Sequence, residues 1–141
     1  MSNRDNVQTT QNAYAAFSRG DVPAVLASLT DDVDWLIPGP ADAIPYAGRR
    51  RGPAQVAKFF EALAAAEEVL AFEPREFVSE GDTVVACGNY RARVKTTGRT
   101  YEAEWVHVFH FRDGKVANFK EFFDTAVAVA AHAGAGVAAT R

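Results

Sequence analysis

The 141-residue sequence has a single cysteine and only three histidines. One cysteine excludes an intramolecular disulfide, and no spacing of cysteine and histidine resembles a zinc site. Charge or glycine interrupts every hydrophobic stretch, so no run of about eighteen apolar residues exists to cross a membrane. Fifteen basic residues against eighteen acidic ones leave a net charge of −3, without the basic excess that binds nucleic acid.

Apolar and aromatic residues, in contrast, are plentiful. They make up 48% of the sequence and include ten phenylalanines, four tyrosines and two tryptophans. A chain of this length is the size of one domain, and it can bury most of its apolar surface in a single core. The polar first residues lack the apolar segment of a signal peptide, so we expect a protein of the cytoplasm.

Apolar residues at helical spacing predict three helices in the first half of the chain. The first ends at Gly20, and the second begins after Asp21, whose side chain suits a helix N-cap. The third begins at Pro53 and ends near Ala66. Between the second and third helices we expect a turn at 30–32, a strand at 33–37 and an unusually long loop at 38–52.

The hydrophobic period then changes from 3.6 to 2, which predicts an antiparallel meander of four strands at 69–79, 83–95, 100–112 and 115–123. A helix that frays towards the end of the chain is expected in the last seventeen residues. Helices and strands segregated in this way indicate an α+β fold. We expect three helices packed on a curved, mostly antiparallel sheet, a cone whose apolar interior forms a small-molecule pocket.

His107 is the main candidate for chemistry. Alternation along its strand places it on one face with Trp105 and Phe109. Histidine transfers protons near neutral pH, and a neutral imidazole also donates a hydrogen bond to a developing oxyanion. A structural histidine within the sheet is the alternative. His110 falls on the opposite face, which argues against a metal site built from the two, and no metal or organic cofactor is expected.

The turn at Asp113-Gly114 decides which acidic residue faces His107. A two-residue turn without a bulge places the following residues beside it: Asn118, Lys120 and Asp124. A turn with a one-residue glycine bulge instead places these: Ala117, Phe119, Glu121 and Phe123. The second register leaves the more polar set on the outer face, so we favour it, with Glu121 as the partner of His107.

Several short segments carry a family resemblance: YAAFSRGD at 14–21, LTDDVDW at 29–35, PYAG at 45–48, WVH at 105–107 and FDT at 123–125. With them the chain resembles the nuclear-transport-factor-2-like (NTF2-like) superfamily, in particular the SnoaL-like branch of polyketide cyclases and relatives of ketosteroid isomerase. The resemblance implies the cystatin-like cone fold. It describes one SnoaL-like domain over 1–141, with a core at about 7–130 and a frayed, alanine-rich tail at 131–141.

The resemblance also implies that an internal cavity binds a small hydrophobic carbonyl compound. Cofactor-free acid–base catalysis of the isomerase, cyclase or lyase type would follow, and a non-catalytic binding module of the same fold is the alternative. The catalytic positions of ketosteroid isomerase do not carry over, because Ala13, Ile37 and His107 stand at them. A standard Δ5-3-ketosteroid isomerase is therefore not expected.

By resemblance, Asp124 matches the acid–base aspartate of SnoaL-like cyclases, so both Asp124 and Glu121 remain candidates beside His107. The residues expected to bind substrate are Trp105, Tyr14, Trp35, Tyr46, Phe60 and Phe109. On the outer face of the sheet an apolar set would be exposed in a monomer and predicts a homodimer: Val106, Val108, Val116 and Phe122.

Overall fold

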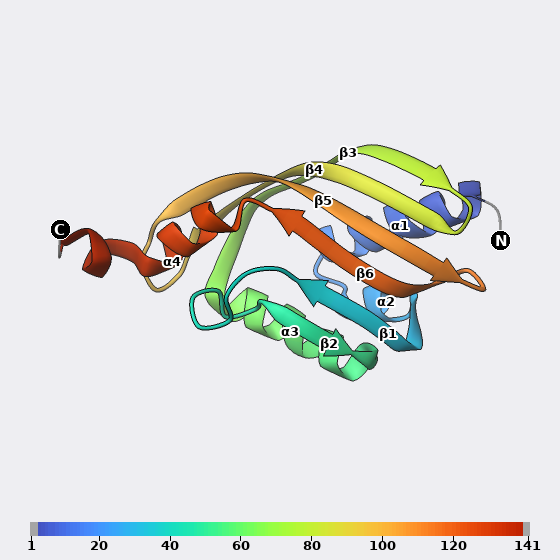
Figure 1. The fold of residues 1–141 in the computed structure, drawn as a ribbon, viewed down its shortest axis with the longest axis horizontal. Helices are drawn as coiled ribbons and strands as arrows, with labels where there is room; N and C mark the ends of the chain where they lie inside the picture. Colours follow the sequence, from blue (N-terminus) through green and yellow to red (C-terminus); the bar gives the residue numbers. More distant parts are fainter. Residues whose placement is uncertain (1–2, 140–141) are drawn as a thin grey trace.

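The computed structural model describes residues 3–139, and side chains within 4–133. Over this range the sheet has six strands in the order β2-β1-β6-β5-β4-β3, with helices against its concave face and at one end (Figure 1). The elements are α1 (Asn3–Ser18), α2 (Val22–Leu26), β1 (Leu29–Ile37), β2 (Gly48–Arg51), α3 (Gly52–Ala66), β3 (Glu67–Glu80), β4 (Thr83–Val94), β5 (Thr100–Arg112), β6 (Lys115–Phe123) and α4 (Thr125–Ala139). The predicted α+β class is confirmed.

The four-strand meander is present as β3 to β6, with every neighbouring pair antiparallel. β1 joins the sheet beside β6 in the parallel direction, and β2 pairs with the other edge of β1. Register shifts interrupt the β1–β6, β3–β4 and β5–β6 pairings. Such irregularities bend strands and increase their twist, so the sheet curves and creates a concave side.

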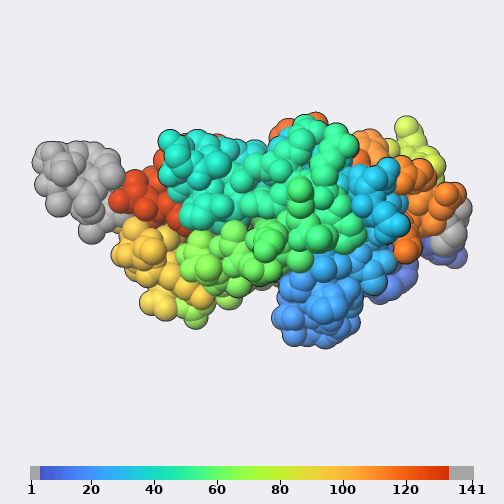
Figure 2. Space-filling model, turned by 90° about the horizontal axis from the view of Figure 1, so that it is seen from below, coloured from blue at the N-terminus to red at the C-terminus, as the bar shows by residue number. Residues whose placement is uncertain are grey.

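The concave side is covered by helices whose apolar stripes face the sheet. On α3 the buried side chains include Val56, Phe59, Phe60 and Leu63, the spacing of one helix face. α1 packs beneath β3 and β4, whereas α3 packs against β1. Figure 2 views the molecule from below and shows α3, in green, across this side, with the blue region around α2 next to it. The core therefore lies between these helices and the sheet.

The expected helix boundaries agree with the structure. Asp21 Oδ1 accepts a hydrogen bond from the Ala24 amide at 3.2 Å and caps α2. Pro53 lies in the first turn of α3, and that helix ends at Ala66 as predicted. No helix in the described part of the chain is long and apolar enough to cross a membrane.

Two segments were predicted wrongly. Residues 30–32, expected to turn, lie inside β1, where an irregularity accommodates them between Leu29 and Asp34. The arginines at 49–51, expected within a loop, form most of the edge strand β2. Arg49 Nη1 lies 2.7 Å from Asp34 Oδ2, so charge pairing with β1 supports a strand that has no hydrophobic pattern.

The hairpin between β5 and β6 combines both of the turns considered. Asp113 and Gly114 have φ values of +52° and +80°, and Arg112 pairs with Lys115, so the turn itself has two residues. The bulge lies further along, at Ala117, where the register shifts between the Phe111–Val116 and His110–Asn118 pairs. The favoured register is therefore correct, but the position of the bulge was not.

The position of the bulge also decides where Val116 points. Because the extra residue follows Val116, this side chain faces inward and is buried. The expectation that Val116 belongs to the exposed outer face is therefore wrong, whereas Val106 and Phe122 are exposed there. At the end of the chain α4 extends to Ala139, and residues 140–141 of the expected tail lie outside the described residues.

Gly88 provides a test of the packing beneath the cavity wall. A Cβ at this position would lie 2.6 Å from Trp105 Cζ2 and would also collide with the Glu73 carbonyl. We expect Gly88→Ala to lower the free energy of unfolding by about 1–3 kcal/mol, as overpacked cores do, measured by urea denaturation. Cys87→Ala, on the other face of the same strand, is the control and costs at most about 1 kcal/mol. Equal stabilities of the two variants would contradict this packing.

Candidate functional site

The concave side of the sheet encloses a cavity of about 110 Å³. Its walls come from α1, α3 and the strands β1 and β3 to β6, and they are mostly aromatic or aliphatic. An engineered apolar cavity of about 150 Å³ holds benzene, so this one suits a compound of about one ring. All six residues expected to bind substrate line it: Tyr14, Trp35, Tyr46, Phe60, Trp105 and Phe109.

A chain of three polar side chains crosses this apolar wall. Tyr14 comes from α1, His107 from β5 and Glu121 from β6, and all three line the cavity. The Tyr14 hydroxyl lies 2.8 Å from His107 Nδ1, and His107 Nε2 lies 2.9 Å from Glu121 Oε2. His107 and Glu121 are direct cross-strand partners in the register that the bulge at Ala117 sets. The side chain of His107 is 8% exposed and that of Glu121 is 18% exposed.

The hydrogen-bond donors and acceptors of Tyr14, His107 and Glu121 decide which atoms of these side chains carry protons. Burial, with a contribution from the charge of Glu121, raises the pKa of Tyr14 far above its usual value, so its hydroxyl stays protonated. An ionised carboxylate only accepts hydrogen bonds, so the proton between His107 and Glu121 belongs to Nε2. His107 Nδ1 is then free to accept from the Tyr14 hydroxyl. Glu121 Oε1 does not take part in the hydrogen bond with His107 and remains the oxygen available to a ligand.

Stacked rings hold His107 in place. Its imidazole lies nearly parallel to the Trp105 indole at a centroid distance of 4.1 Å, and edge-on to Phe119 at 4.7 Å. Phe119 in turn stacks on Trp35 at 4.0 Å. The imidazole therefore has little rotational freedom, and its orientation is fixed by packing as well as by hydrogen bonds.

The same tryptophans carry two hydrogen-bond donors without acceptors. The indole Nε1 atoms of Trp35 and Trp105 are buried and have no hydrogen-bond partner in the described part of the chain. Buried polar groups are almost always paired, because leaving one unpaired costs about 1–3 kcal/mol. Since both residues line the cavity, an oxygen atom of a bound ligand is a suitable acceptor for them.

The structure does not bring Asp124 to this site. Its side chain is exposed at the end of β6, outside the cavity lining. Asp124 Oδ1 accepts a hydrogen bond from the Ala126 amide at 3.1 Å, which caps the first turn of α4. Of the two candidate carboxylates, only that of Glu121 contacts His107.

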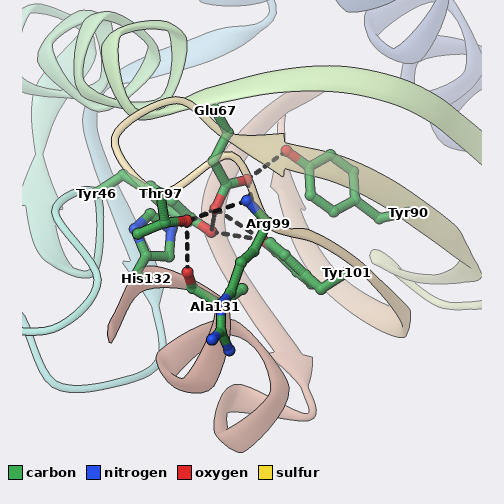
Figure 3. A network of polar contacts seen from close by, with 8 residues as sticks. All are labelled: Tyr46, Glu67, Tyr90, Thr97, Arg99, Tyr101, Ala131 and His132. Atoms are coloured by element: carbon green, nitrogen blue, oxygen red, sulfur yellow. Dashed lines mark hydrogen bonds and ion pairs between the residues drawn. The ribbon is translucent and has the colours of Figure 1, made fainter. Parts of the chain in front are cut away.

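A second polar cluster, which the sequence analysis did not identify, surrounds Glu67 (Figure 3). The Glu67 side chain is fully buried and accepts hydrogen bonds from the hydroxyls of Tyr46, Tyr90 and Tyr101 at 2.6–2.9 Å. His132 Nε2 from α4 lies 2.7 Å from Glu67 Oε2. The three tyrosines also line the cavity.

Part of this second cluster had a signal in the sequence. Tyr101 lies on the same face of its strand as Trp105 and His107 by simple alternation, so its position was predictable. Glu67 had no such signal in the sequence, because it stands where α3 changes to β3 and neither the helical nor the alternating hydrophobic pattern applies. His132 depends on where α4 docks, which no local pattern specifies.

Metal binding finds no support in the described side chains, since no group of three or more histidine, cysteine or carboxylate residues is arranged to hold an ion. His110 is on the outer face, where its Nδ1 lies 3.1 Å from the Thr83 hydroxyl. The two strand histidines thus face opposite sides of the sheet, in agreement with the alternation.

The buried tyrosines predict a steep loss of stability at alkaline pH. Burial raises the pKa of all four tyrosines, Tyr14, Tyr46, Tyr90 and Tyr101, far above the usual value of 10.0. The unfolded chain therefore loses protons above pH 10 that the folded protein keeps. The contribution of the buried tyrosines to the free energy of unfolding is fully present below about pH 10. Above it, this free energy falls by about 1.4 kcal/mol per pH unit for each tyrosine.

Tyrosinate absorbance and circular dichroism, followed together through an alkaline titration, measure this effect. We expect tyrosinate to appear only as the protein unfolds, in one steep transition. Gradual ionisation with a midpoint near pH 10 in the folded protein would contradict the burial of these hydroxyls.

Comparison with known proteins places this chain in a family. The model of the SnoaL-like domain family matches residues 10–119. An NTF2-like protein of known structure from Burkholderia xenovorans is 37% identical, with a TM-score of 0.85 over 94% of this chain and 98% of its own. An NTF2-like protein of unknown function from Burkholderia pseudomallei is 31% identical, with a TM-score of 0.81 over 93% and 98%.

TerC, solved in co-crystals with polyporic acid, is 26% identical, with a TM-score of 0.80 over 92% of this chain and 98% of its own. No curated protein matches the chain. The match to the family model over most of the chain and the structural relatives agree with the observed fold. The chain belongs to the SnoaL-like family of the NTF2-like superfamily.

Proposed function

We propose that the cavity binds a small hydrophobic carbonyl compound and that Glu121 removes a proton from the carbon next to the carbonyl. The observation that carries this proposal is the Tyr14–His107–Glu121 chain on an otherwise apolar wall. Removal of such a proton begins isomerisation, cyclisation and elimination reactions without a metal or organic cofactor. The co-crystallisation of the relative TerC with polyporic acid supports a small-molecule ligand for this chain.

Glu121 is the base in this scheme because of its free oxygen. Oε2 contacts His107, whereas Oε1 has no hydrogen bond to the described residues. A carboxylate in an apolar cavity is poorly solvated, and an apolar site also strengthens its interaction with the substrate proton. Proton transfer by a positioned carboxylate accelerates such a reaction by about 10²–10⁴.

His107 acts as a positioning residue for Glu121. Both of its ring nitrogens are engaged, one with Tyr14 and one with Glu121, so neither is available to the substrate oxygen. The Nε2–H bond holds the carboxylate in one orientation, and Tyr14 fixes the tautomer that makes this bond possible. This role differs from the direct contact with an oxyanion considered from the sequence.

The unpaired indole of Trp105 is the donor that we assign to the oxyanion. Its Nε1–H is buried without an acceptor, and its ring stacks on His107. A fixed donor in a dry site stabilises developing negative charge without reorganisation, and loss of one such donor typically costs 10²–10³ in rate. Trp35, whose Nε1 is also unpaired, is the second donor on the same wall.

Exchange of the α-hydrogens of cyclohexanone in deuterium oxide, followed by proton NMR, tests this chemistry without a known substrate. We expect the protein to accelerate exchange above the buffer rate, and Glu121→Gln to remove at least 10² of that acceleration. The Gln side chain keeps the size and the hydrogen-bonding capacity of Glu121 but is not a base at neutral pH.

Asp124→Asn is the matched control, because asparagine also caps a helix and the residue lies outside the cavity. It should retain exchange within about twofold, as expected of a surface substitution. Loss of exchange in Asp124→Asn with retention in Glu121→Gln would contradict the assignment of the base. Binding of ketone by the unaltered protein without any exchange would instead support the non-catalytic binding module.

We further propose that the outer face of the sheet joins two copies of the chain. Val78, Val106 and Phe122 are 65%, 37% and 52% exposed there. The register aligns Val106 with Phe122 in one row, while Val78 belongs to the neighbouring row, which ends at Lys120. Glu76 at one margin of this face is acidic, and Lys120 at the other margin is basic. In a dimer with twofold symmetry each charge can face its opposite on the second copy, so a second copy is a complementary partner.

Analytical ultracentrifugation at micromolar concentration tests this assembly. We expect twice the mass of one chain for the unaltered protein and a shift towards the mass of one chain for Phe122→Lys. Leu70→Lys, at a similarly apolar position that is 39% exposed elsewhere on β3, should leave the mass unchanged. Sedimentation of the unaltered protein as a single chain would contradict the proposed dimer.

A further inference from the structure

Three tyrosines that line the cavity, Tyr46, Tyr90 and Tyr101, direct their hydroxyls at Glu67. Glu67 stands at the first position of β3, and its carboxylate is completely buried. Figure 3 shows this carboxylate among the tyrosine rings of Tyr46, Tyr90 and Tyr101, with His132 reaching it from α4. An isolated charge in such a place is very costly, so its hydrogen bonds decide whether it is tolerated.

A count of protons shows that the carboxylate is saturated. Its two oxygens offer about four lone-pair sites. The hydroxyls of Tyr46, Tyr90 and Tyr101 and the Nε2 position of His132 supply four donors to them. Burial and the charge of Glu67 raise the pKa of each of these tyrosines, so the hydroxyls remain protonated. The Tyr90 proton is thus committed to Glu67, and the Tyr46 and Tyr101 protons are shared between Glu67 and the contact of these two hydroxyls.

The oxygens of these hydroxyls, in contrast, retain capacity to accept. Each phenolic oxygen has lone pairs that the Glu67 interaction does not use, although Tyr46 and Tyr101 also contact each other at 2.9 Å. All three tyrosines line the cavity, and the charge of Glu121 acts on Tyr90 and Tyr101. The cavity lining therefore includes tyrosines whose oxygens can accept hydrogen bonds and tryptophans whose indole N–H groups are unpaired.

An anchor for α4 alone does not explain this arrangement. The His132–Glu67 contact and the hydrogen bond from the Thr97 hydroxyl to the Ala131 carbonyl, 2.8 Å, already attach the helix. Such an anchor does not require tyrosines on the cavity wall, where most of the other lining residues are apolar. A polar surface that accepts hydrogen bonds inside a ligand cavity is a recognition element.

We infer that the tyrosine cluster at Glu67 binds a hydroxyl group of the ligand, so the ligand is a hydroxylated ring compound and not a plain carbonyl compound. This inference rests on the proposed function, since it requires that the cavity bind a carbonyl compound. It adds a specificity element formed by Tyr46, Tyr90 and Tyr101 and oriented by Glu67. A hydroxyl that donates to one of these oxygens satisfies the remaining capacity of the cluster, whereas a methyl or methoxy group cannot donate.

Three probes of the same ring ketone separate the possibilities: 4-hydroxycyclohexanone, 4-methylcyclohexanone and 4-methoxycyclohexanone. Their dissociation constants are measured by isothermal titration calorimetry on the full chain. We expect the hydroxyl probe to bind about three- to tenfold more tightly than the methyl probe, the range of one neutral hydrogen bond. The methoxy probe, which only accepts, should bind no better than the methyl probe.

Glu67→Gln provides the decisive variant. The amide of glutamine donates two hydrogen bonds where the carboxylate accepted them, so tyrosine protons are released towards the cavity. We expect the preference to reverse, with the methoxy probe at least as tight as the hydroxyl probe. Tyr101→Phe keeps the ring and should reduce the advantage of the hydroxyl probe to less than twofold, so the inference remains testable if Glu67→Gln does not fold.

Asp124→Asn, which changes a carboxylate outside the cavity lining, is the control and should retain the hydroxyl preference. Binding of all three probes with equal affinity would overturn the inference and leave the proposed function intact. A preference kept in both Asp124→Asn and Glu67→Gln would also overturn it. Absence of binding by every probe would contradict the proposed function itself, and with it this inference.

Discussion

The hydrogen bond between His107 and Glu121 is the interaction on which the candidate site depends. It joins neighbouring strands at one cross-strand pair, and the extra residue at Ala117 sets the register that creates this pair. Because side chains alternate along a strand, a change of one residue in the register would move Glu121 to the outer face. A small irregularity near the hairpin thus decides whether the cavity contains a carboxylate at all.

Two carboxylates illustrate how an apolar interior accommodates charge: Glu121, which lines the cavity, and Glu67, which is buried among tyrosines that line it. Glu67 receives four donors and leaves no lone pair idle, so it is bound in a fixed position. Glu121 receives one donor and keeps an oxygen free. The same residue type is therefore suited to two roles, the saturated one to orienting hydroxyls and the unsaturated one to proton transfer.

The fold and part of the candidate site were predictable because they follow from the helical and alternating spacing of apolar residues along the sequence. The change from helical to alternating spacing located α3 and the meander, and alternation placed Trp105, His107 and Phe109 together on one face. The polar balance of the outer face selected the register that pairs Glu121 with His107. Asp124, suggested by resemblance, caps α4 instead, because the strand ends before it.

The remaining features depend on contacts that no local pattern contains. Glu67 lies at a junction of two elements, and His132 reaches it only because α4 docks at that end of the sheet. Strand β2 has no hydrophobic pattern, and a charge pair between Arg49 and Asp34 links it to β1. The unpaired indoles of Trp35 and Trp105 are visible only when every possible acceptor around them has been placed.

The state of the His107 imidazole is the most direct measure of this account. Long-range nitrogen–proton NMR correlation spectra distinguish the two neutral tautomers and report the hydrogen bonds of each ring nitrogen. We expect a proton on Nε2 that Glu121 protects from exchange with water, and an unprotonated Nδ1 that accepts from Tyr14. A proton on Nδ1 in the neutral ring, or an Nε2 proton whose protection is unaffected by Glu121→Ala, which removes the acceptor, would contradict this assignment.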